Sequence, residues 1–175
     1  MQKQVRIVVY HAKQCDPRKC TALKLKRHGR IRVVPQMRLL PRGAVILNPF
    51  SSIAFSPADR NRMEEAGLGA LDCSWEHAEK VLRERVRGTS RCLPILMAGN
   101  PVNFAKPTKL TTAEALAAAL YIVGLTDEAE DLLSIFKWGH SFFDLNRERL
   151  DLYATAKSST EIVEIQRRFM LDVES

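Results

Sequence analysis

The sequence predicts an α/β protein: a parallel β-sheet domain over residues 1–92, then an all-helical domain over residues 93–175, with a ligand cleft between them. In the first part, short apolar runs alternate with helix-like segments, a pattern typical of parallel strands joined by helices. In the second part, helix capping boxes precede segments with a 3.6-residue apolar period. The chain of 175 residues is 46% hydrophobic, which suffices for one domain or two small ones with a buried core.

Strands are predicted where apolar, often β-branched, residues run together between turn residues. The second run ends at Pro35 and the third at Asn48-Pro49. The predicted strands are residues 5–10, 31–34, 44–47, 68–71 and 92–97.

Two helices are predicted between these strands. Ser56 can cap a helix that has Pro57 at its first position and ends at Gly67. Ser74 can cap a second helix over residues 75–86.

Four helices are predicted in the second part. A capping box of Thr111 and Glu114 starts the first, which ends at Gly124. The second begins at Thr126 and closes at Gly139. We expect Asn146 to cap the third, which carries Leu150 and Tyr153, and Ser158 with Glu161 to cap the fourth, which carries Ile162, Ile165 and Phe169 on one face.

Positive charge is concentrated at the amino end. Residues 1–42 hold twelve Lys or Arg and one acidic residue, Asp16, whereas the other 133 residues have a balance of −4 and the whole chain +7. A positive field confined to one part of the chain suits a polyanion, because each neutralised phosphate releases counterions. We therefore favour a nucleic-acid partner over a merely solvated basic face. A membrane role fits less well, since no broad apolar face accompanies the charges.

Export and membrane insertion are not expected. The longest apolar stretch, residues 115–123, is too short to cross a bilayer, and the amino terminus lacks a signal-peptide pattern. We expect a cytoplasmic monomer, in which the four cysteines are reduced thiols.

Four polar or turn-forming segments follow predicted strands. In open parallel sheets, ligands bind at the carboxyl ends of the strands, so we expect these segments to converge on one crevice. They are residues 11–21, 48–52, 72–75 and 98–103.

Asp72 and Trp75 are candidate site residues at a strand-to-helix junction. Asp72 has the chemistry of a general base or a ligand acceptor, and Trp75 that of an aromatic wall. Spacing alone favours a simpler interpretation, a helix cap and a core tryptophan.

A metal site of His11, Cys15 and Cys20 is not predicted, because the spacing is unusual and a fourth ligand is not evident. The chain also lacks the glycine-rich dinucleotide, P-loop and nucleophile-elbow motifs, which weakens the case for a standard dinucleotide enzyme, an NTPase or a serine hydrolase.

Two other segments permit more than one interpretation. The Asn- and Pro-rich residues 100–110 are either a plain linker or a source of free backbone groups for an adenine or ribose. The aromatic cluster of Phe136, Trp138, Phe142 and Phe143 is better explained by packing between helices than by stacking on an RNA base.

Taken in order, these segments resemble the small-subunit (16S/18S) ribosomal RNA aminocarboxypropyltransferase family of archaea and eukaryotes. The most specific are Asp72-Cys73-Ser74-Trp75 and Asn100-Pro101-Val102-Asn103, and the resemblance covers nearly the whole chain. The other matching stretches are residues 15–21 with Leu23, residues 47–49, Arg91 with Leu93-Pro94, Lys106-Pro107 with Leu110, residues 114–118 and 136–139, Asn146, Leu150 and Tyr153.

The chain departs from this family pattern at three positions. Phe104 stands where tyrosine is expected, Ala105 where glycine is usual, and Thr108 where eukaryotic members commonly have an aromatic residue.

The resemblance implies a transferase that uses S-adenosylmethionine as co-substrate and no metal. It implies transfer of the 3-amino-3-carboxypropyl group to N3 of a modified uridine, 1-methylpseudouridine, in small-subunit rRNA or a pre-ribosomal particle. The implied fold resembles the knotted, SPOUT-like class of RNA methyltransferases, with a trefoil knot. Because a sulfonium activates all three attached carbons, the protein selects the product by the carbon that it presents.

The resemblance also implies roles for individual residues. Asp72 is the candidate base or orienting group for the uridine N3 proton, and orientation is the safer role for a weakly basic carboxylate. Trp75 and Ala78 would enclose the methyl group. The other expected contacts to S-adenosylmethionine are Thr21 at the carboxylate, Leu23 and Leu47 at the adenine, and the backbone near Leu71, Leu93, Thr108 and Thr112.

Six basic residues near the amino end are expected to hold RNA phosphates: Arg18, Lys19, Lys24, Lys26, Arg27 and Arg30. Three alternatives stay open at this point: a knotted methyltransferase that uses the same co-substrate, a non-catalytic ribosome-assembly module that binds RNA, and a metal-binding module.

Overall fold

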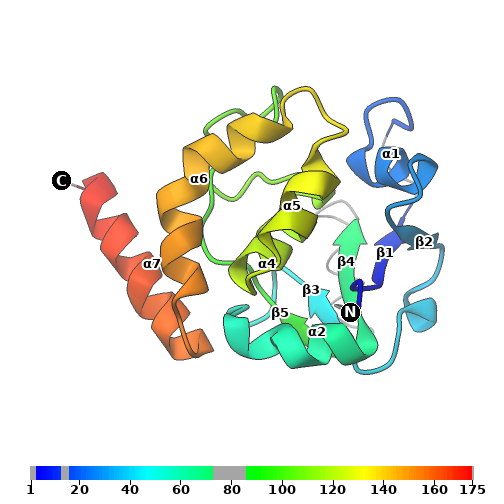
Figure 1. Cartoon of the computed structure of the whole chain (residues 1–175), viewed down its shortest axis with the longest axis horizontal. Coiled ribbons are helices and arrows are strands. Elements are labelled where there is room, and N and C mark those ends of the chain that lie inside the picture. Colours follow the sequence, from blue (N-terminus) through cyan, green and yellow to red (C-terminus); the bar gives the residue numbers. More distant parts are fainter. Residues whose placement is uncertain (1–2, 13–15, 73–85, 175) are drawn as a thin grey trace.

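The computed structural model describes residues 3–12, 16–72 and 86–174. Its described strands form one five-stranded sheet in the order β2-β1-β4-β3-β5, and all the pairings are parallel (Figure 1). This confirms the predicted parallel α/β sheet. The strands are β1 Ile7–His11, β2 Arg32–Val34, β3 Val45–Leu47, β4 Leu68–Asp72 and β5 Thr89–Arg91.

The helices lie before, between and after these strands. Figure 1 shows α4 and α5 beside the sheet, α6 beyond them and α7 at the edge farthest from β1 and β2. The amino-terminal part contains α1 Thr21–Arg27, the 3-10 turns η1 Met37–Leu39 and η2 Pro57–Asp59, and α2 Arg60–Ala66. The carboxyl-terminal part contains α4 Thr112–Ile122, α5 Thr126–Leu133, α6 Gly139–Ala154 and α7 Ser159–Glu174.

The sheet buries both of its faces, and successive side chains on a strand alternate between them. On β1, Ile7 and Val9 join the large core shared with the helices, whereas Val8 and Tyr10 join a smaller cluster on the other face. On β3, Ile46 likewise faces the smaller cluster. Burial on both faces explains why these strands have near-continuous apolar runs.

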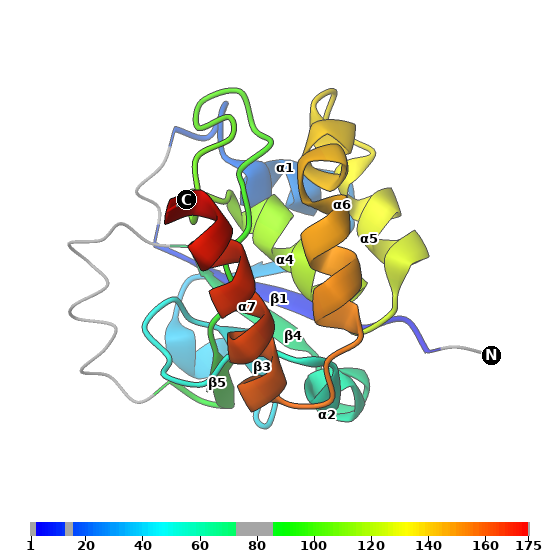
Figure 2. The same cartoon turned by 90° about the vertical axis from the view of Figure 1, so that its left-hand side faces the viewer.

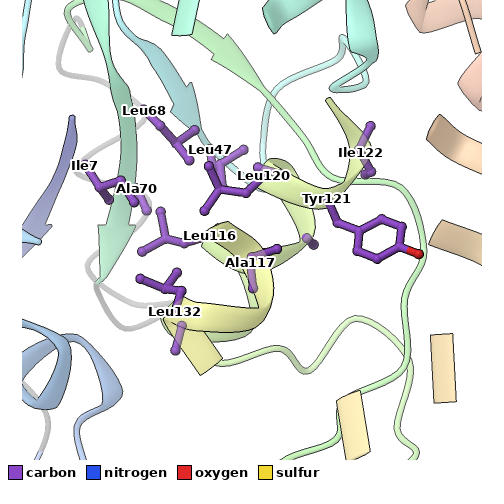
Figure 3. Close-up of a cluster of buried hydrophobic side chains, with 14 of the residues drawn as sticks. Ile7, Leu47, Leu68, Ala70, Leu116, Ala117, Leu120, Tyr121, Ile122 and Leu132 are labelled. Carbon is purple, nitrogen blue, oxygen red and sulfur yellow. The ribbon is translucent and has the colours of Figure 1, made fainter. Parts of the chain in front are cut away.

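Helix α4 is the centre of the large core. Almost all of its residues are buried, and its sequence TAEALAAALYI explains why: alanines let neighbours approach closely, while leucines fill the space toward the sheet. Figure 3 shows Leu116 and Leu120 of α4 pointing toward Leu47 and Ala70 of the sheet. A helix that is apolar on every side is a core helix, so the start of α4 is held firmly beside the carboxyl ends of the strands.

The capping predictions at α4 are confirmed. Thr111 and Glu114 form a reciprocal capping box, and Gly124 follows the helix with a φ of 90°. Ser56 and Asp59 also form a capping box, which starts η2 with Pro57 at its first position. Ser158 and Glu161 are the predicted capping pair of α7. The Ser158 hydroxyl accepts a hydrogen bond from Glu161 N–H, and the Glu161 carboxylate accepts one from Lys157 N–H. The predicted helix 75–86 lies almost entirely outside the described residues.

One predicted strand is wrong. The run 92–97 is not a strand, and the last described strand is Thr89–Arg91. Pro94 has no N–H to donate. The N–H groups of Ile95 and Met97 bond instead to Gln166 Oε1 (2.8 Å) and Asn146 Oδ1 (2.7 Å) of the helical part.

Two helix boundaries in the second part are also wrong. Helix α5 ends at Leu133 and α6 begins at Gly139, so Gly139 starts a helix instead of closing one. A side chain at Gly139 would collide with the Leu133 carbonyl, which explains the glycine there. Asn146 does not cap a helix: it lies inside α6, fully buried, and its amide nitrogen donates to the carbonyls of Met97 and Phe142 at 2.8 Å each.

The division at residue 92 stays a prediction, although the core includes residues from both parts, from Val5 to Ile162. Among the helices of the described ranges, none is both long and apolar enough for a bilayer crossing.

Candidate active site

A cavity of about 400 Å³ lies at the carboxyl ends of β3, β4 and β5, against the start of α4. Its size is within the range of small-molecule sites. Its walls are mostly apolar, and Asp72 is the only carboxylate among its described lining residues. The lining comes from three stretches that follow strands and from the segment leading into α4: residues 47–50, 70–72, 92–96 and 108–115.

Most of the predicted contacts meet in this cavity. Leu47, Leu71, Asp72, Leu93, Thr108 and Thr112 line it. Leu23 packs against the core from α1 and is not among the lining residues. Trp75 and Ala78 lie outside the described residues.

The prediction that strand-end segments converge on one crevice is confirmed in part, and one predicted segment is replaced by another. Residues 48–50 and Asp72 line the cavity, and His11 and Cys20 of the first segment contact Asp72, but residues 98–103 are not among the described lining residues. The later end of the same connector, from Thr108 to Thr112, lines the cavity instead, together with Cys92, Leu93 and Pro94 after β5.

Asp72 is linked to two buried side chains of the amino-terminal segment. His11 pairs with Asp72 in the sheet register, and their side chains approach to 3.8 Å between Nε2 and Oδ2. The Cys20 thiol donates to Asp72 Oδ2 at 3.6 Å and lies 3.4 Å from His11 Nε2. The three groups form a chain, His11–Cys20–Asp72, that restricts the carboxylate to one orientation at the cavity wall.

The loop before α1 is built so that Cys20 reaches this position. The N–H groups of Lys19 and Cys20 both bond to the Asp16 carbonyl at 3.0 Å, and the Asp16 carboxylate accepts from Arg18 N–H. One residue later, the Thr21 hydroxyl accepts from the Ala113 N–H at 3.3 Å. This bond joins the start of α1 to the start of α4, but Thr21 itself is not among the described lining residues of the cavity.

The same three side chains have metal-ligating atoms. His11, Cys20 and Asp72 offer one ligand atom each, all within 4.8 Å of one another, and nitrogen, sulfur and oxygen are ligand types that zinc accepts. The metal site considered from the sequence combined His11 and Cys20 with Cys15, which lies outside the described residues; in the structure Asp72 joins His11 and Cys20. A closed zinc site takes four protein ligands, and the described residues supply three.

Glu114 organises the connector that borders the cavity. This fully buried carboxylate accepts from the N–H groups of Gly99 (2.6 Å), Asn100 (3.0 Å) and Thr111 (2.7 Å). It also accepts from the Asn100 amide and from the Thr111 hydroxyl, both at 2.9 Å. One side chain therefore fixes both ends of the segment between residues 99 and 111.

One thiol, that of Cys92, is among the described lining residues of the cavity. Burial raises the pKa of Cys92, so this thiol stays protonated at neutral pH and is a poor nucleophile. Cys20 and Cys92 are the free cysteines of the described residues.

The six predicted RNA-binding residues have different surroundings. Arg18, Lys19, Lys26 and Arg27 are exposed. Lys24 is half-buried, with its ammonium 4.9 Å from the centre of the Phe136 ring, and Arg30 pairs with Asp131 of α5. Of the exposed four, Arg18 and Lys19 lie in the loop before α1, and Lys26 and Arg27 lie in the last turn of α1.

Sequence reasoning expected residues 48–52 at the crevice but assigned no individual role to Asn48 or Phe50. Phe50, 39% exposed, lines the wall, and the neighbouring Asn48 is buried and accepts from Phe50 N–H at 3.0 Å. An aromatic residue directly after a strand-ending Asn-Pro turn was the available signal. In contrast, the predicted packing role of Phe136, Phe142 and Phe143 is confirmed, because all three are buried.

These features define a class: an α/β ligand-binding protein whose pocket lies at the carboxyl ends of parallel strands, with a basic surface beside it. Residues 45–170 match the family model described as "Ribosome biogenesis protein, C-terminal". The 16S rRNA aminocarboxypropyltransferase of Methanothermobacter thermautotrophicus is 53% identical over 95% of this chain and 99% of its own. That of Methanosarcina acetivorans is 50% identical over 96% of each chain.

A solved structure agrees with these relatives. The SAM-dependent rRNA:acp-transferase Tsr3 from Vulcanisaeta distributa has a TM-score of 0.83 and 39% identity, with 95% of this chain and 96% of that chain covered. The chain belongs to the 16S rRNA aminocarboxypropyltransferase family, as its motifs predicted.

Residues 5–38 also match a model described as a possible Fer4-like domain in RNase L inhibitor. Iron–sulfur clusters of that type are held by four cysteine thiolates. The matched segment contains two, Cys15 and Cys20, so its residues do not fit a cluster.

Proposed function

We propose that this protein transfers the 3-amino-3-carboxypropyl group of S-adenosylmethionine to 16S rRNA. The observation that carries the proposal is the near-full-length match, at up to 53% identity among the relatives above, to 16S rRNA aminocarboxypropyltransferases. The apolar cavity with its single described carboxylate supports it, since the co-substrate combines a flat adenine with a cationic sulfur.

Leu47, Leu71 and Leu93 supply apolar contacts for the nucleoside, and the backbone at Thr108 and Thr112 supplies polar ones. Their common position on the cavity wall supports these roles. Thr21 binds the carboxylate of the co-substrate: its hydroxyl oxygen accepts from Ala113, and its own hydrogen can donate.

Three further contacts complete the proposed site. Leu23 flanks the adenine, with its place on α1, directly after Thr21, as support. Trp75 and Ala78 enclose the methyl group, which leaves the methylene carbon of the transferred group as the accessible electrophile.

In the transfer, uridine N3 attacks this methylene carbon. A new N–C bond forms, the C–S bond breaks with both electrons going to sulfur, and 5′-methylthioadenosine leaves. The N3 proton must depart as well. We assign this proton to Asp72: its carboxylate accepts a hydrogen bond from N3–H, which orients the base, and receives the proton as the N–C bond forms, before passing it to solvent.

The His11–Cys20–Asp72 chain works in this proposal by hydrogen bonding and not by holding a metal. The thiol-to-carboxylate contact of 3.6 Å supports the hydrogen bond. Enzyme treated with EDTA and shown to be metal-free should keep its full rate, and loss of activity that zinc restores would reverse this assignment.

The acceptor is proposed in finer detail: N3 of 1-methylpseudouridine in small-subunit rRNA or its precursor particle. Of the six basic residues assigned to its phosphates, the exposed four, Arg18, Lys19, Lys26 and Arg27, make the direct contacts, while Lys24 and Arg30, which contact Phe136 and Asp131, add positive field. We also propose that the protein works as a monomer in the cytoplasm.

We further propose that the chain is knotted, like the SPOUT-like methyltransferases that it resembles. The all-parallel sheet and the central position of α4 support this. Pulling the denatured chain by its ends tests it, because a trefoil knot leaves a contour shorter than 175 residues allow.

The decisive experiment uses S-adenosylmethionine labelled in its carboxyl carbon or in its methyl carbon, incubated with the protein and a 16S rRNA hairpin that contains 1-methylpseudouridine. Carboxyl label in the RNA without methyl label is the expected result. Methyl label alone would make the protein a methyltransferase, and neither label would leave an RNA-binding assembly module.

A further inference from the structure

The segment of residues 98–110, the connector loop, exposes large apolar side chains beside the cavity. Val102 is 80% exposed, the highest fraction among the large hydrophobic residues that the structure describes, and Phe104 is 55% exposed. Exposed apolar side chains that gather in one place, as these two do within three residues, mark interaction sites. Both lie a few residues before Thr108, which lines the cavity.

The connector loop holds these side chains out on a fixed framework. Met97 and Pro107 form an antiparallel bridge, Ala98 N–H donates to the Lys106 carbonyl at 2.9 Å, and Ala105 N–H donates to the Ala98 carbonyl at 2.7 Å. Glu114 and Asn100 hold the base of the loop from inside. The exposed tip is therefore an ordered feature of the fold.

The loop also has an unfavourable backbone conformation. Ala105 and Thr108 both have a φ of 61°, in the left-handed region that non-glycine residues rarely adopt. Residues held in such conformations need surrounding contacts to maintain them and are concentrated at functional sites. Here the strain lies on either side of Lys106 and Pro107, between the exposed aromatic ring and the cavity.

The charge of the connector loop identifies its partner. Residues 98–110 contain two lysines, Lys106 and Lys109, both exposed, and no acidic residue. An aromatic ring with lysines nearby is the combination that binds single-stranded nucleic acid, since the ring stacks on a base and the ammonium groups contact phosphates. An acidic peptide would use the lysines but would leave the ring without a matching surface.

The position of the loop fits the same partner. Figures 1 and 2 both place the connector loop at the same end of the molecule as α1 and the loop before it. Phe104 is four residues from Thr108, so their Cα atoms are at most about 14 Å apart. A strand that delivers its uridine to the cavity has neighbouring nucleotides within reach of the loop.

We propose that the connector loop is a second RNA-binding surface, on which Phe104 stacks against an unpaired base next to the target uridine while Lys106 contacts the backbone. Val102 packs against the same or the next base. This rests on the proposed function and adds to it a second contact, besides the amino-terminal basic residues, that positions the target nucleotide.

The test measures the Kd of the labelled hairpin and of a fully paired duplex of the same length, with the Kd of S-adenosylmethionine as a separate readout. Phe104→Leu, which removes the ring and keeps apolar bulk, should weaken hairpin binding at least fivefold and up to roughly 100-fold. Phe104→Tyr should restore it. Duplex binding and co-substrate binding should change less than twofold.

Matched controls lie at distant exposed positions. Leu171→Ala on α7 and Lys157→Gln between α6 and α7 remove an exposed apolar side chain and an exposed lysine elsewhere, and both should leave the hairpin Kd unchanged. Lys106→Gln should make the plot of log K against log salt less steep by about 0.7, the value for one phosphate contact on a single strand.

If Phe104→Leu binds the hairpin with the same Kd as the unmodified chain, the inference is overturned. This holds even if the unmodified chain transfers the carboxyl label, so the proposed function would stand. An equal loss of co-substrate affinity would also overturn the inference, because it would place the ring at the cavity and not on RNA. If the unmodified chain transfers no label, the proposed function is contradicted. If the unmodified chain does not bind the hairpin, the proposed function and the second RNA-binding surface are both contradicted.

Discussion

Asp72 faces the cavity with partners that come from a different part of the chain. The carboxylate ends β4, where sequence reasoning expected a site residue, because polar residues after parallel strands meet at one sheet edge. Its link to Cys20 was not predictable, since the two are 52 positions apart and no local pattern marks a thiol as a hydrogen-bond donor. The register of β1 on β4, which brings His11 beside Asp72, is likewise a property of the folded sheet.

Removing the Asp72 carboxylate should slow the reaction more than it weakens co-substrate binding. We expect Asp72→Ala to lower kcat about 100-fold, the lower end of the range for a group that assists proton transfer, with the Kd of S-adenosylmethionine within about threefold. Asp72→Asn, which keeps an acceptor oxygen, should lose less. Single-turnover rates and calorimetry measure both quantities. The matched control is Asp144→Asn, an exposed carboxylate on α6, and unchanged turnover in Asp72→Ala would remove Asp72 from the mechanism.

Cys20 should act as a positioning residue, through the orientation of Asp72. Cys20→Ala removes the donor to the carboxylate and should lower kcat roughly five- to tenfold, as expected for one hydrogen bond, with KM unchanged. Cys20→Ser keeps an O–H donor and should restore most of the rate. Equal rates in the two variants would show that the thiol contributes only packing, and thermal melts show whether either variant unfolds.

At the scale of elements, the connector loop and α4 form one unit through Glu114. The capping box at Thr111 was readable from the sequence, because its Thr-x-x-Glu spacing is local. The other bonds of Glu114, to Gly99 and Asn100, were not, since they depend on where the loop returns. The same limit explains Asn146, whose polar side chain suggested a helix cap but binds the Met97 backbone.

Neutralising Glu114 should loosen the loop and the cavity rim together. Glu114→Gln places an NH2 group against N–H donors, and we expect the free energy of unfolding to fall by about 3 kcal/mol. Co-substrate affinity should fall as well, because Thr108 and Thr112 shift with the loop. Chemical denaturation and calorimetry provide the two measurements. Glu148→Gln, an exposed site on α6, is the control and should change neither.

Tyr153 joins α6 to the segment after β5 and gives a pH signature. Its hydroxyl donates to the Ile95 carbonyl at 3.0 Å, and burial raises its pKa to about 12. Because the folded state favours the neutral phenol, its contribution to stability is complete below the unfolded pKa near 10 and is lost as pH rises toward 12. The stability advantage over Tyr153→Phe should therefore shrink between pH 10 and 12. A constant difference across that range would contradict the assignment.

At the scale of the whole molecule, charge and cavity are brought together by the fold. The basic residues of positions 1–42 were visible in the composition, and so was their suitability for a polyanion. Which of them face solvent was not visible, because the pairing of Arg30 with Asp131 and the contact of Lys24 with Phe136 depend on helices formed a hundred residues later.

The exposed basic residues should set the salt dependence of RNA binding. Replacing Arg18, Lys19, Lys26 and Arg27 together by glutamine should make the slope of log K against log salt less steep by about 3, from four lost phosphate contacts. Arg167→Gln with Arg168→Gln on α7 removes exposed charge from the other side of the molecule, and its slope should stay unchanged. Equal slopes for all the proteins would mean that the amino-terminal residues do not contact phosphates.

The parallel order of the sheet also determines when the protein acquires its selectivity during synthesis. Ile7 of β1 pairs with Leu68 of β4, and Val45 of β3 with Thr89 of β5, so the sheet cannot close until residues near 91 have left the ribosome. Parallel pairing across such separations forms slowly. Until then, residues 1–42, with their balance of +11, are an unstructured polycation beside ribosomal RNA. The growing chain thus has affinity for any RNA before it can recognise one uridine, and purification should require high salt to remove the nucleic acid captured in that interval.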